Sequence, residues 1–455
     1  MRPNAVTGVD RTLRAAAVAL GRIGILVAAT ASLAACNIFS PAPPPPLPGE
    51  RISILSLEKT LEPDPGIQDV QVRLPRPFAN PAWTQSGGSA TKAMHHLAIG
   101  EAPSRRWRTS IGAGSTRERR LTASPVVSGG LIYTLDAAGT VSAFDAASGD
   151  RRWRFDVVPR GENRGALGGG LAVAGQTLFV STGYGEVIAL AADTGASIWR
   201  SALKVPLASP PTVTGSLLFV VSQDNQTFGL RVTDGSPVWN HVGIAETSGL
   251  VGAGSPAVAN GIVVVPYSSG ELVALRADNG SVLWSDTLAR GGPTTALGEI
   301  TDINGYPLID RGTVYAVGHS GRMVANDLTS GARLWTQDIS GSGSPWIAGD
   351  FLYLVTSESE LIALSRQDGR IRWVTELPRY ERPDTLQDPI AWGGPVLGSD
   401  RLIIVASTGD AVAVSPYTGR MLGNLRLSDS MYLPPVLAGE SLYFLTDDGA
   451  LVAYR

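Results

Sequence analysis

The sequence is poor in the residues from which covalent cross-links and metal sites are built. It has one cysteine and four histidines among 455 residues. A single thiol cannot close a disulfide within the chain, and it excludes metal sites held by several thiolates. The sequence therefore predicts no metal site and no cofactor.

Charge is also scarce. Charged residues make up 17% of the chain, and the formal net charge is −3. Nucleic-acid binding depends on a surplus of lysine and arginine opposite the phosphates. We therefore expect no nucleic-acid partner.

The apolar stretch near the N-terminus, residues 23–31, is too short to span a membrane as a helix. Four arginines precede it, and Leu33-Ala34-Ala35-Cys36 follows it, so that the only cysteine stands where a lipobox requires one. This order is typical of a bacterial lipoprotein signal peptide. We expect cleavage before Cys36 and acylation of both its thiol and its new amino group. A cysteine that lies by chance near an ordinary cleavage site is the alternative.

Three acyl chains on one residue would hold the protein firmly on a membrane, since a single chain binds only marginally. Asn37, rather than an aspartate, follows the cysteine, which favours the periplasmic face of the outer membrane. Residues 1–35 contain four arginines and one aspartate, so their removal takes the formal charge to about −6.

The rest of the chain divides by composition. Residues 36–49 hold the lipidated cysteine and a proline-rich linker, which reads as a semi-rigid spacer. Residues 50–100 mix apolar pieces with prolines and predict an extended strap. Residues 101–455 carry an internal repeat.

The repeat is marked by a glycine followed four residues later by a tryptophan. Such a glycine fits a tight hairpin turn that needs a positive φ, and we expect the tryptophan to pack against the neighbouring repeat and bury a large apolar surface. The copies begin at Gly149, Gly195, Gly235, Gly280, Gly331 and Gly369, and a seventh at Gly419 has Gly423 in place of the tryptophan.

Each repeat contains four short segments with alternating apolar residues, separated by turns, as in hairpin strands. Eight innermost strands can be counted, and the last copy stops without a fourth strand. Residues 106–111 form a fourth strand with nothing before it, so we expect it to complete the last copy. The predicted fold is all-β: an eight-bladed β-propeller of four-stranded antiparallel blades, closed by an N-terminal strand. An open β-solenoid is the structural alternative.

The repeat form in Leu190-Ala-Ala-Asp-Thr-Gly-Ala-Ser-Ile-Trp199 resembles the PQQ-type propeller repeat. Together with the lipobox, the spacer, residues 81–88 (Pro-Ala-Trp-Thr-Gln-Ser-Gly-Gly) and eight blades, the chain resembles the BamB (formerly YfgL) family of lipoproteins. The resemblance implies a non-catalytic subunit of the outer-membrane β-barrel assembly machinery. It further implies binding to the POTRA domains of BamA, contact with other subunits and unfolded outer-membrane proteins, and a monomer within the complex.

Two family elements for BamA binding are matched in part. Residues 299–307 fit an Asp-x-Asp/Asn element, with Asp302 at the first acidic position, Asn304 at the second and Glu299 just before them. Residues 205–210 match a Leu-x-Leu-Arg loop only at Leu207, and the arginine is missing.

The residues support the first element independently. The step from Trp284 to Trp335 is 51 residues, the longest between successive tryptophans, and its surplus lies in residues 290–304. Loops that outgrow their scaffold often carry binding sites. A surface aspartate that is merely solvated is the alternative.

Two other functions remain open. A PQQ-dependent dehydrogenase would use the propeller axis to hold a quinone over a metal ion, but no cluster of metal ligands is evident. His95-His96 is adjacent in an extended segment, so the two rings point apart. A periplasmic propeller adaptor unrelated to barrel assembly is the other possibility.

Overall fold

The computed structural model describes residues 61–246, 254–289, 302–341, 343–427 and 429–455. Leu61–Arg455 forms one compact unit. The predicted signal peptide, Cys36 and the linker lie outside the described residues, as does Glu299. Within the described ranges, no helix has the length and apolar character needed to cross a membrane.

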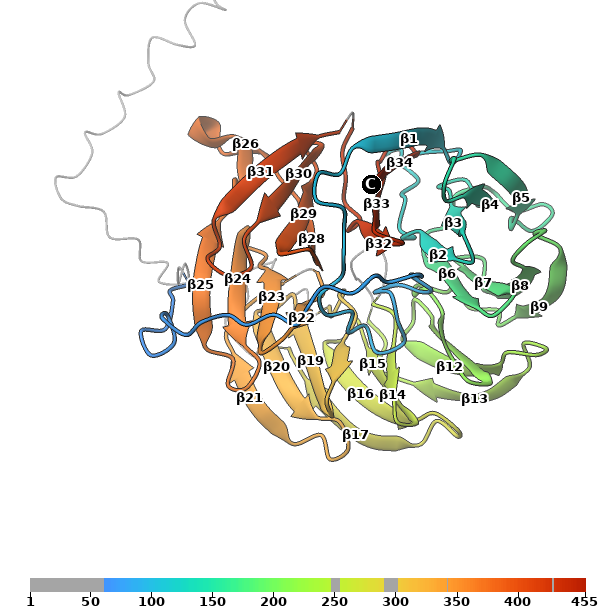
Figure 1. Ribbon diagram of the computed structural model, residues 1–455. Helices are drawn as coiled ribbons and strands as arrows, with labels where there is room; N and C mark the ends of the chain where they lie inside the picture. Colours follow the sequence, from blue (N-terminus) through green and yellow to red (C-terminus); the bar gives the residue numbers. More distant parts are fainter. Residues whose placement is uncertain (1–60, 247–253, 290–301, 342, 428) are drawn as a thin grey trace, which may run out of the picture. The chain divides into compact units, whose positions relative to one another are not determined.

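Eight four-stranded antiparallel sheets are arranged around a common centre (Figure 1). The first four complete blades are β2 (Val126–Ser128), β3 (Leu131–Leu135), β4 (Thr140–Asp145) and β5 (Arg151–Asp156); β6 (Gly169–Ala174), β7 (Thr177–Thr182), β8 (Glu186–Ala191) and β9 (Ser197–Ala202); β10 (Thr212–Thr214), β11 (Leu217–Val221), β12 (Gln226–Arg231) and β13 (Pro237–Val242); and β14 (Ala257–Ala259), β15 (Ile262–Pro266), β16 (Glu271–Arg276) and β17 (Val282–Thr287).

The next three blades are β18 (Leu308–Asp310), β19 (Thr313–Gly318), β20 (Arg322–Asp327) and β21 (Arg333–Gln337); β22 (Trp346–Ala348), β23 (Phe351–Val355), β24 (Glu360–Ser365) and β25 (Ile371–Glu376); and β28 (Trp392–Gly398), β29 (Arg401–Ala406), β30 (Asp410–Val414) and β31 (Met421–Arg426). The closing blade combines β32 (Val436–Ala438), β33 (Ser441–Leu445) and β34 (Ala450–Tyr454) with β1 (Arg105–Ser110).

The closure predicted from the sequence is confirmed. β1 pairs antiparallel with β34, with Trp107 opposite Ala453 and Ser110 opposite Ala450. The eight-bladed propeller is therefore closed by a strand from the N-terminal side of the chain. An open β-solenoid is excluded.

The burial of the strands follows from their place in the blade. The second and third strands are sandwiched between neighbouring blades, so β7 and β8 are almost wholly buried. The fourth strands lie at the rim, and β5 and β9 expose alternate residues. Because a strand turns successive side chains to opposite faces, a rim strand can bury one face and hydrate the other.

The repeated tryptophan joins neighbouring blades, as the sequence predicts. Trp153 lies against Gly195 in the next blade, where a Cβ atom would be 2.5 Å from the ring, and its Nε1 donates a hydrogen bond of 3.0 Å to the carbonyl of Ala192. The same pair of contacts recurs at seven junctions, made by Trp107, Trp153, Trp199, Trp239, Trp284, Trp335 and Trp373. Glycine is required there because it accepts a positive φ and leaves room for the indole ring.

The fold explains the missing eighth tryptophan. Each tryptophan packs on the turn between the third and fourth strands of the following blade. In the closing blade these strands are β34 and β1, which lie at opposite ends of the propeller sequence and share no turn. A tryptophan at Gly423 would have no glycine turn to meet, and nothing lies within 4 Å of the position its Cβ would occupy.

Residues 61–100 run over the ring and cross its centre (Figure 1). Residues 80–97 form hydrogen bonds with the innermost region of every blade. Asn80 bonds to Leu437 and Gly439, Trp83 to Val127, Thr84 to Val173, and Gln85 to Val213. Ala90 bonds to Val258, Thr91 to Ile309, His95 to Trp346, and Leu97 to Leu397 and Ser399. The strap thus satisfies inner-edge backbone groups that would otherwise lack partners.

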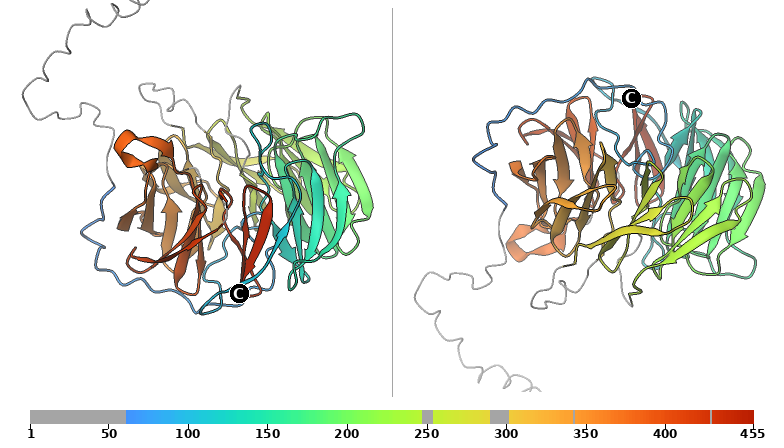
Figure 2. Two further views of the ribbon diagram at one scale, coloured as in Figure 1. Left: turned by 90° about the horizontal axis from the view of Figure 1, so that it is seen from above. Right: turned by 90° about the horizontal axis from the view of Figure 1, so that it is seen from below.

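One insertion interrupts the blade order. Between β25 and the β28–β31 blade, β26 (Tyr380–Arg382) and β27 (Gln387–Pro389) form a small two-stranded sheet, and the short 3₁₀ helix η2 (Pro383–Thr385) connects them. Figure 2 shows it projecting from the ring on the side away from the strap.

Candidate interaction surfaces

The strap places a buried lysine near the axis. The side chain of Lys92 is 1% exposed, and its Nζ donates hydrogen bonds to the carbonyl of Ser86 (2.8 Å) and to Oγ1 of Thr212 (3.2 Å). Nζ also lies 5.9 Å from the ring centre of Tyr306. Loss of hydration lowers the pKa of Lys92 to about 7. Its contacts tie the strap to β10, which is a structural role.

The described residues do not form the quinone and metal site of a dehydrogenase. No group of three or more histidine, cysteine, aspartate or glutamate side chains lies close enough to hold a metal ion among them. His95 and His96 have separate partners: His95 Nε2 lies 3.5 Å from Asp310, while Nδ1 of His96 contacts the carbonyl of Pro75.

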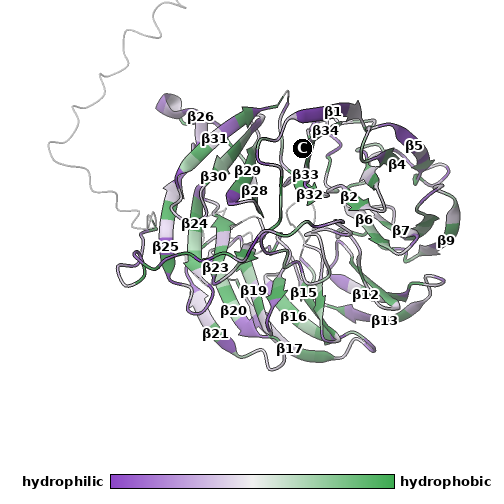
Figure 3. Ribbon diagram, in the orientation of Figure 1, coloured by the Kyte–Doolittle hydropathy of each residue, from purple (hydrophilic) through white to green (hydrophobic). Residues whose placement is uncertain are grey.

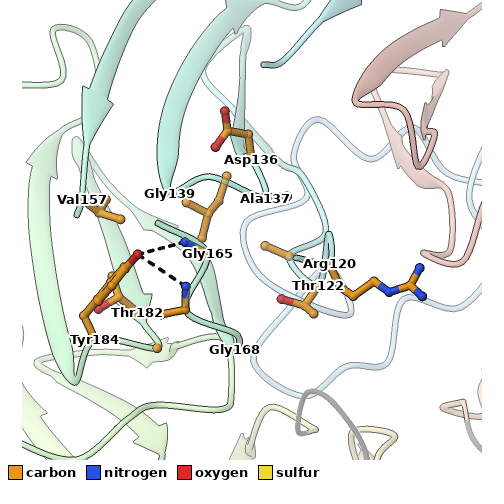
Figure 4. Close-up of a pocket in the computed structure, with 14 residues that line it drawn as sticks. Arg120, Thr122, Asp136, Ala137, Gly139, Val157, Gly165, Gly168, Thr182 and Tyr184 are labelled. Atoms are coloured by element: carbon orange, nitrogen blue, oxygen red, sulfur yellow. Dashed lines mark hydrogen bonds between the residues drawn. The ribbon is translucent and has the colours of Figure 1, made fainter. Parts of the chain in front are cut away.

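A small pocket lies between the β2–β5 and β6–β9 blades (Figure 4). The hydroxyl of Tyr184 accepts hydrogen bonds from the backbone N–H groups of Gly165 and Ala166, at 3.1 and 3.4 Å, and donates one to the carbonyl of Asn163. The pocket has a volume of about 30 Å³, whereas small-molecule sites are typically ~300–1,000 Å³. It can hold water, and its polar groups stabilise the loop.

Asp302 and Asn304 lie just before β18, where the chain enters the blade. Asp302 is only 3% exposed, and its backbone carbonyl accepts a hydrogen bond from the N–H of His319 (2.9 Å). Asn304 is partly exposed. The alternative of a merely solvated surface aspartate is therefore wrong, because Asp302 and Ile303 are buried between the β14–β17 and β18–β21 blades. Binding through this loop stays a prediction, and Asn304 is its more accessible side chain.

Leu207 is fully buried against apolar residues of the β6–β9 and β10–β13 blades, including Ala172 and Phe179. Its N–H also donates to the carbonyl of Thr182. The side chain supports the loop from inside. A partner at this loop would meet the exposed neighbours Lys204 and Pro206. Contact through this loop stays a prediction, and the buried side chain of Leu207 does not reach the surface in this conformation.

The rim of the propeller carries two contrasting surfaces, one apolar and one basic, that the glycine and tryptophan pattern of the repeat did not predict. On four successive rim strands, β9, β13, β17 and β21, the residue before the tryptophan is apolar and 38–55% exposed. We call these residues the apolar arc: Ile198, Val238, Leu283 and Leu334. On β1 and β5 the same position holds Arg106 and Arg152. Aligning the repeats on their tryptophans and reading the preceding residue would have revealed the contrast.

The fourth strands are also the outer edges of their sheets. An outer edge presents backbone N–H and C=O groups that can pair with another strand. The apolar arc thus combines exposed aliphatic side chains with strand edges able to accept an extended chain.

Comparison with known proteins agrees with this architecture. A family model described as outer membrane protein assembly factor BamB matches residues 137–375. The BamB of Bordetella pertussis is 28% identical over 351 residues, which cover 77% of this chain and 86% of the relative. The BamB of Yersinia pestis is 25% identical over 359 residues, which cover 78% and 89%.

Among solved structures, BamB from Moraxella catarrhalis superposes with a TM-score of 0.67 at 17% identity, covering 78% of this chain and all of that one. A europium-containing methanol dehydrogenase reaches 0.66 at 13% identity, covering 82% and 98%. Likeness at such identities shows the fold alone. The family model spans more than half of the sequence, and the curated relatives align with most of it; the chain belongs to the family of the outer membrane protein assembly factor BamB.

Proposed function

We propose that this chain is a non-catalytic scaffold subunit of the outer-membrane β-barrel assembly (BAM) complex. In this role it binds the POTRA domains of BamA, acts as a monomer beside other subunits, and aids delivery and insertion of β-barrel proteins. The observation that carries the proposal is membership of the BamB family across most of the chain. The non-catalytic part rests on the same family membership.

The proposed location is the periplasmic face of the outer membrane, with the protein anchored through acylated Cys36. The lipobox in the sequence and the relatives, which are outer membrane protein assembly factors, support it. The proline-rich linker would then separate the propeller from the bilayer.

The proposed BamA contact includes the loop that leads into β18. Asn304 is partly exposed there, while Asp302 is buried and its backbone carbonyl accepts a hydrogen bond from the N–H of His319. A loop end held in place by burial and a backbone hydrogen bond favours binding, because less entropy is lost when a partner docks.

For client proteins, we propose β-augmentation at the apolar arc. An unfolded barrel strand has alternating apolar residues and unpaired backbone groups. An outer strand edge would supply hydrogen bonds, and the aliphatic side chains of the apolar arc would cover the strand's apolar residues. This mechanism needs no catalytic group.

The decisive experiment is affinity capture of the full lipidated chain from detergent-solubilised membranes, followed by immunoblotting for BamA. We expect BamA to be recovered with the unsubstituted chain. Its absence would overturn membership of the complex.

The loop is tested in the same assay with Asn304→Arg. An arginine at 302 would have to be buried, so the charge is placed at the more accessible position. The matched control is Asn279→Arg, which makes the same change of charge in the exposed turn between β16 and β17, a third and a fourth strand, and so at the opposite end of the blades. Recovery of BamA should fall about tenfold with Asn304→Arg and stay unchanged with the control. Equal recovery would remove this loop from the interface.

A further inference from the structure

The rim strands β1 and β5 concentrate positive charge on an otherwise acidic protein. Their sequences, RRWRTS and RRWRFD, supply six exposed arginines: Arg105, Arg106, Arg108, Arg151, Arg152 and Arg154. We call this set the basic rim. No other rim strand among the described residues carries more than one arginine. Figure 3 shows β1 and β5 as hydrophilic along most of their length.

The two strands belong to adjacent blades. Trp107 of β1 packs on Gly149, in the turn that leads into β5, and donates a hydrogen bond to the carbonyl of Ala146. The six guanidinium groups therefore lie along one continuous sector of the rim. This sector exists because β1 closes the ring beside the first complete blade.

Most of this charge is not neutralised within the protein. Arg108 pairs with Asp448 and Arg152 with Asp145, at 2.9 and 2.6 Å. No carboxylate of the described residues lies within 4.0 Å of the other four guanidinium groups. Beside β1, Arg105 and Arg108 also line an open cavity of about 300 Å³ together with Arg426 of β31. The sector is thus able to meet several negative groups at once.

The surroundings of the basic rim distinguish between possible partners. Protein interfaces usually have an apolar centre with aromatic or aliphatic anchors. No large hydrophobic side chain on β1 or β5 is exposed; the exposed ones on rim strands lie elsewhere, including the apolar arc on four strands and Met421 and Leu422 on β31. Dispersed arginines without an apolar centre match the surface of an anionic bilayer, where each cation near the headgroups adds to attraction.

We propose that the basic rim docks the propeller on the anionic phospholipid surface of a bilayer, with the apolar arc on other blades left accessible. Arginine suits this task because its planar guanidinium binds phosphate oxygens in pairs and stays charged at any physiological pH. The mature chain carries a formal charge of about −6, so docking requires the charge to be gathered in one sector. This inference goes beyond the proposed function and does not depend on BamA binding.

The test uses the full mature chain, residues 36–455, with Cys36→Ser so that no acyl group contributes. Co-sedimentation is measured with vesicles of phosphatidylglycerol mixed with phosphatidylethanolamine, and with vesicles of phosphatidylcholine alone. We expect binding to the anionic vesicles only, and we expect added salt to weaken it.

The variant replaces four unpaired arginines: Arg105→Gln, Arg106→Gln, Arg151→Gln and Arg154→Gln. The control removes the same charge from four exposed arginines on other blades: Arg231→Gln, Arg276→Gln, Arg370→Gln and Arg420→Gln. Binding should weaken at least tenfold in the rim variant and less than threefold in the control. Circular dichroism and the unfolding temperature of each variant are measured to check that it is folded.

Equal weakening in the two variants, or no binding of the parent chain to anionic vesicles at low salt, would overturn the proposal. If vesicles fail to bind and the rim variant instead loses BamA in the capture assay, the basic rim is a protein contact and the lipid proposal is wrong. If the rim variant keeps BamA and loses vesicle binding, both proposals stand separately.

Discussion

The contact between tryptophan and glycine predicts a large difference between two glycine substitutions in one blade. Gly331 lies in the turn before β21 with φ of +72°, and Gly312 lies in the turn between β18 and β19 with φ of +77°. A Cβ on Gly331 would lie 2.5 Å from Cγ of Trp284. A Cβ on Gly312 would have nothing within 4 Å. Alanine at the two positions therefore differs mainly in its contact with Trp284.

The magnitudes follow from these environments. Alanine in the left-handed region costs ~1–2 kcal/mol, and both substitutions carry this cost. Gly331→Ala must also displace a tryptophan that is 8% exposed and that donates a hydrogen bond of 2.8 Å to Leu328. Overpacking of this kind costs a further ~1–3 kcal/mol. We expect a loss of unfolding free energy of ~1–2 kcal/mol for Gly312→Ala and ~2–5 kcal/mol for Gly331→Ala.

The assay is urea unfolding followed by circular dichroism, with the slope of the transition compared among variants. A double-mutant cycle isolates the contact. In a Trp284→Ala background, itself destabilised by ~3–5 kcal/mol, Gly331→Ala should cost no more than Gly312→Ala does.

Two results would refute the reasoning. Equal losses for the two alanine variants would mean that the indole ring does not restrict Gly331. An excess cost of Gly331→Ala that persists without Trp284 would place its origin in the turn itself.

Three further predictions concern the strap, the apolar arc and catalysis. Burial lowers the pKa of Lys92 from 10.5 to about 7, so between these pH values the unfolded state binds more protons than the folded state. The unfolding free energy should therefore rise with pH across that window, and it should rise less in Lys92→Met. Urea unfolding at several pH values measures this difference. Leu283→Lys together with Leu334→Lys should weaken binding of a peptide with an alternating barrel-strand sequence about tenfold by fluorescence anisotropy, whereas Thr194→Lys, in an exposed turn, should leave it unchanged; equal affinities would exclude the apolar arc as the client site. Addition of PQQ and calcium should produce no dye reduction with alcohols, and reproducible turnover would contradict the non-catalytic assignment.

The sequence determined the fold because the information needed for it is local. Hairpin strands pair with their chain neighbours, so the period, the turn glycines and the matching incomplete ends were enough to predict eight blades and closure by β1. The tryptophans were predicted to contact the next blade, and they do so at seven junctions.

The sequence located the site residues along the chain but did not show whether their side chains are buried. The sequence shows that Asp302 and Leu207 precede inner strands, yet both turn inward, since each stands where a connecting loop enters the space between two blades. An aspartate in a long loop is usually solvated, and only packing against the neighbouring blade reverses that expectation.

Tertiary structure alone decided what lies next to what around the ring. The strap bonds to all eight blades because closure gathers their inner strands around one centre, and no local pattern in residues 80–97 predicts this. Gly423 replaces a tryptophan because the closing blade is built from two distant segments. Likewise, the arginines of β1 and β5 form one sector only after closure places the strands in adjacent blades. Pairing between consecutive strands follows from the local sequence, whereas contacts between the two ends of the chain depend on the geometry of the closed ring.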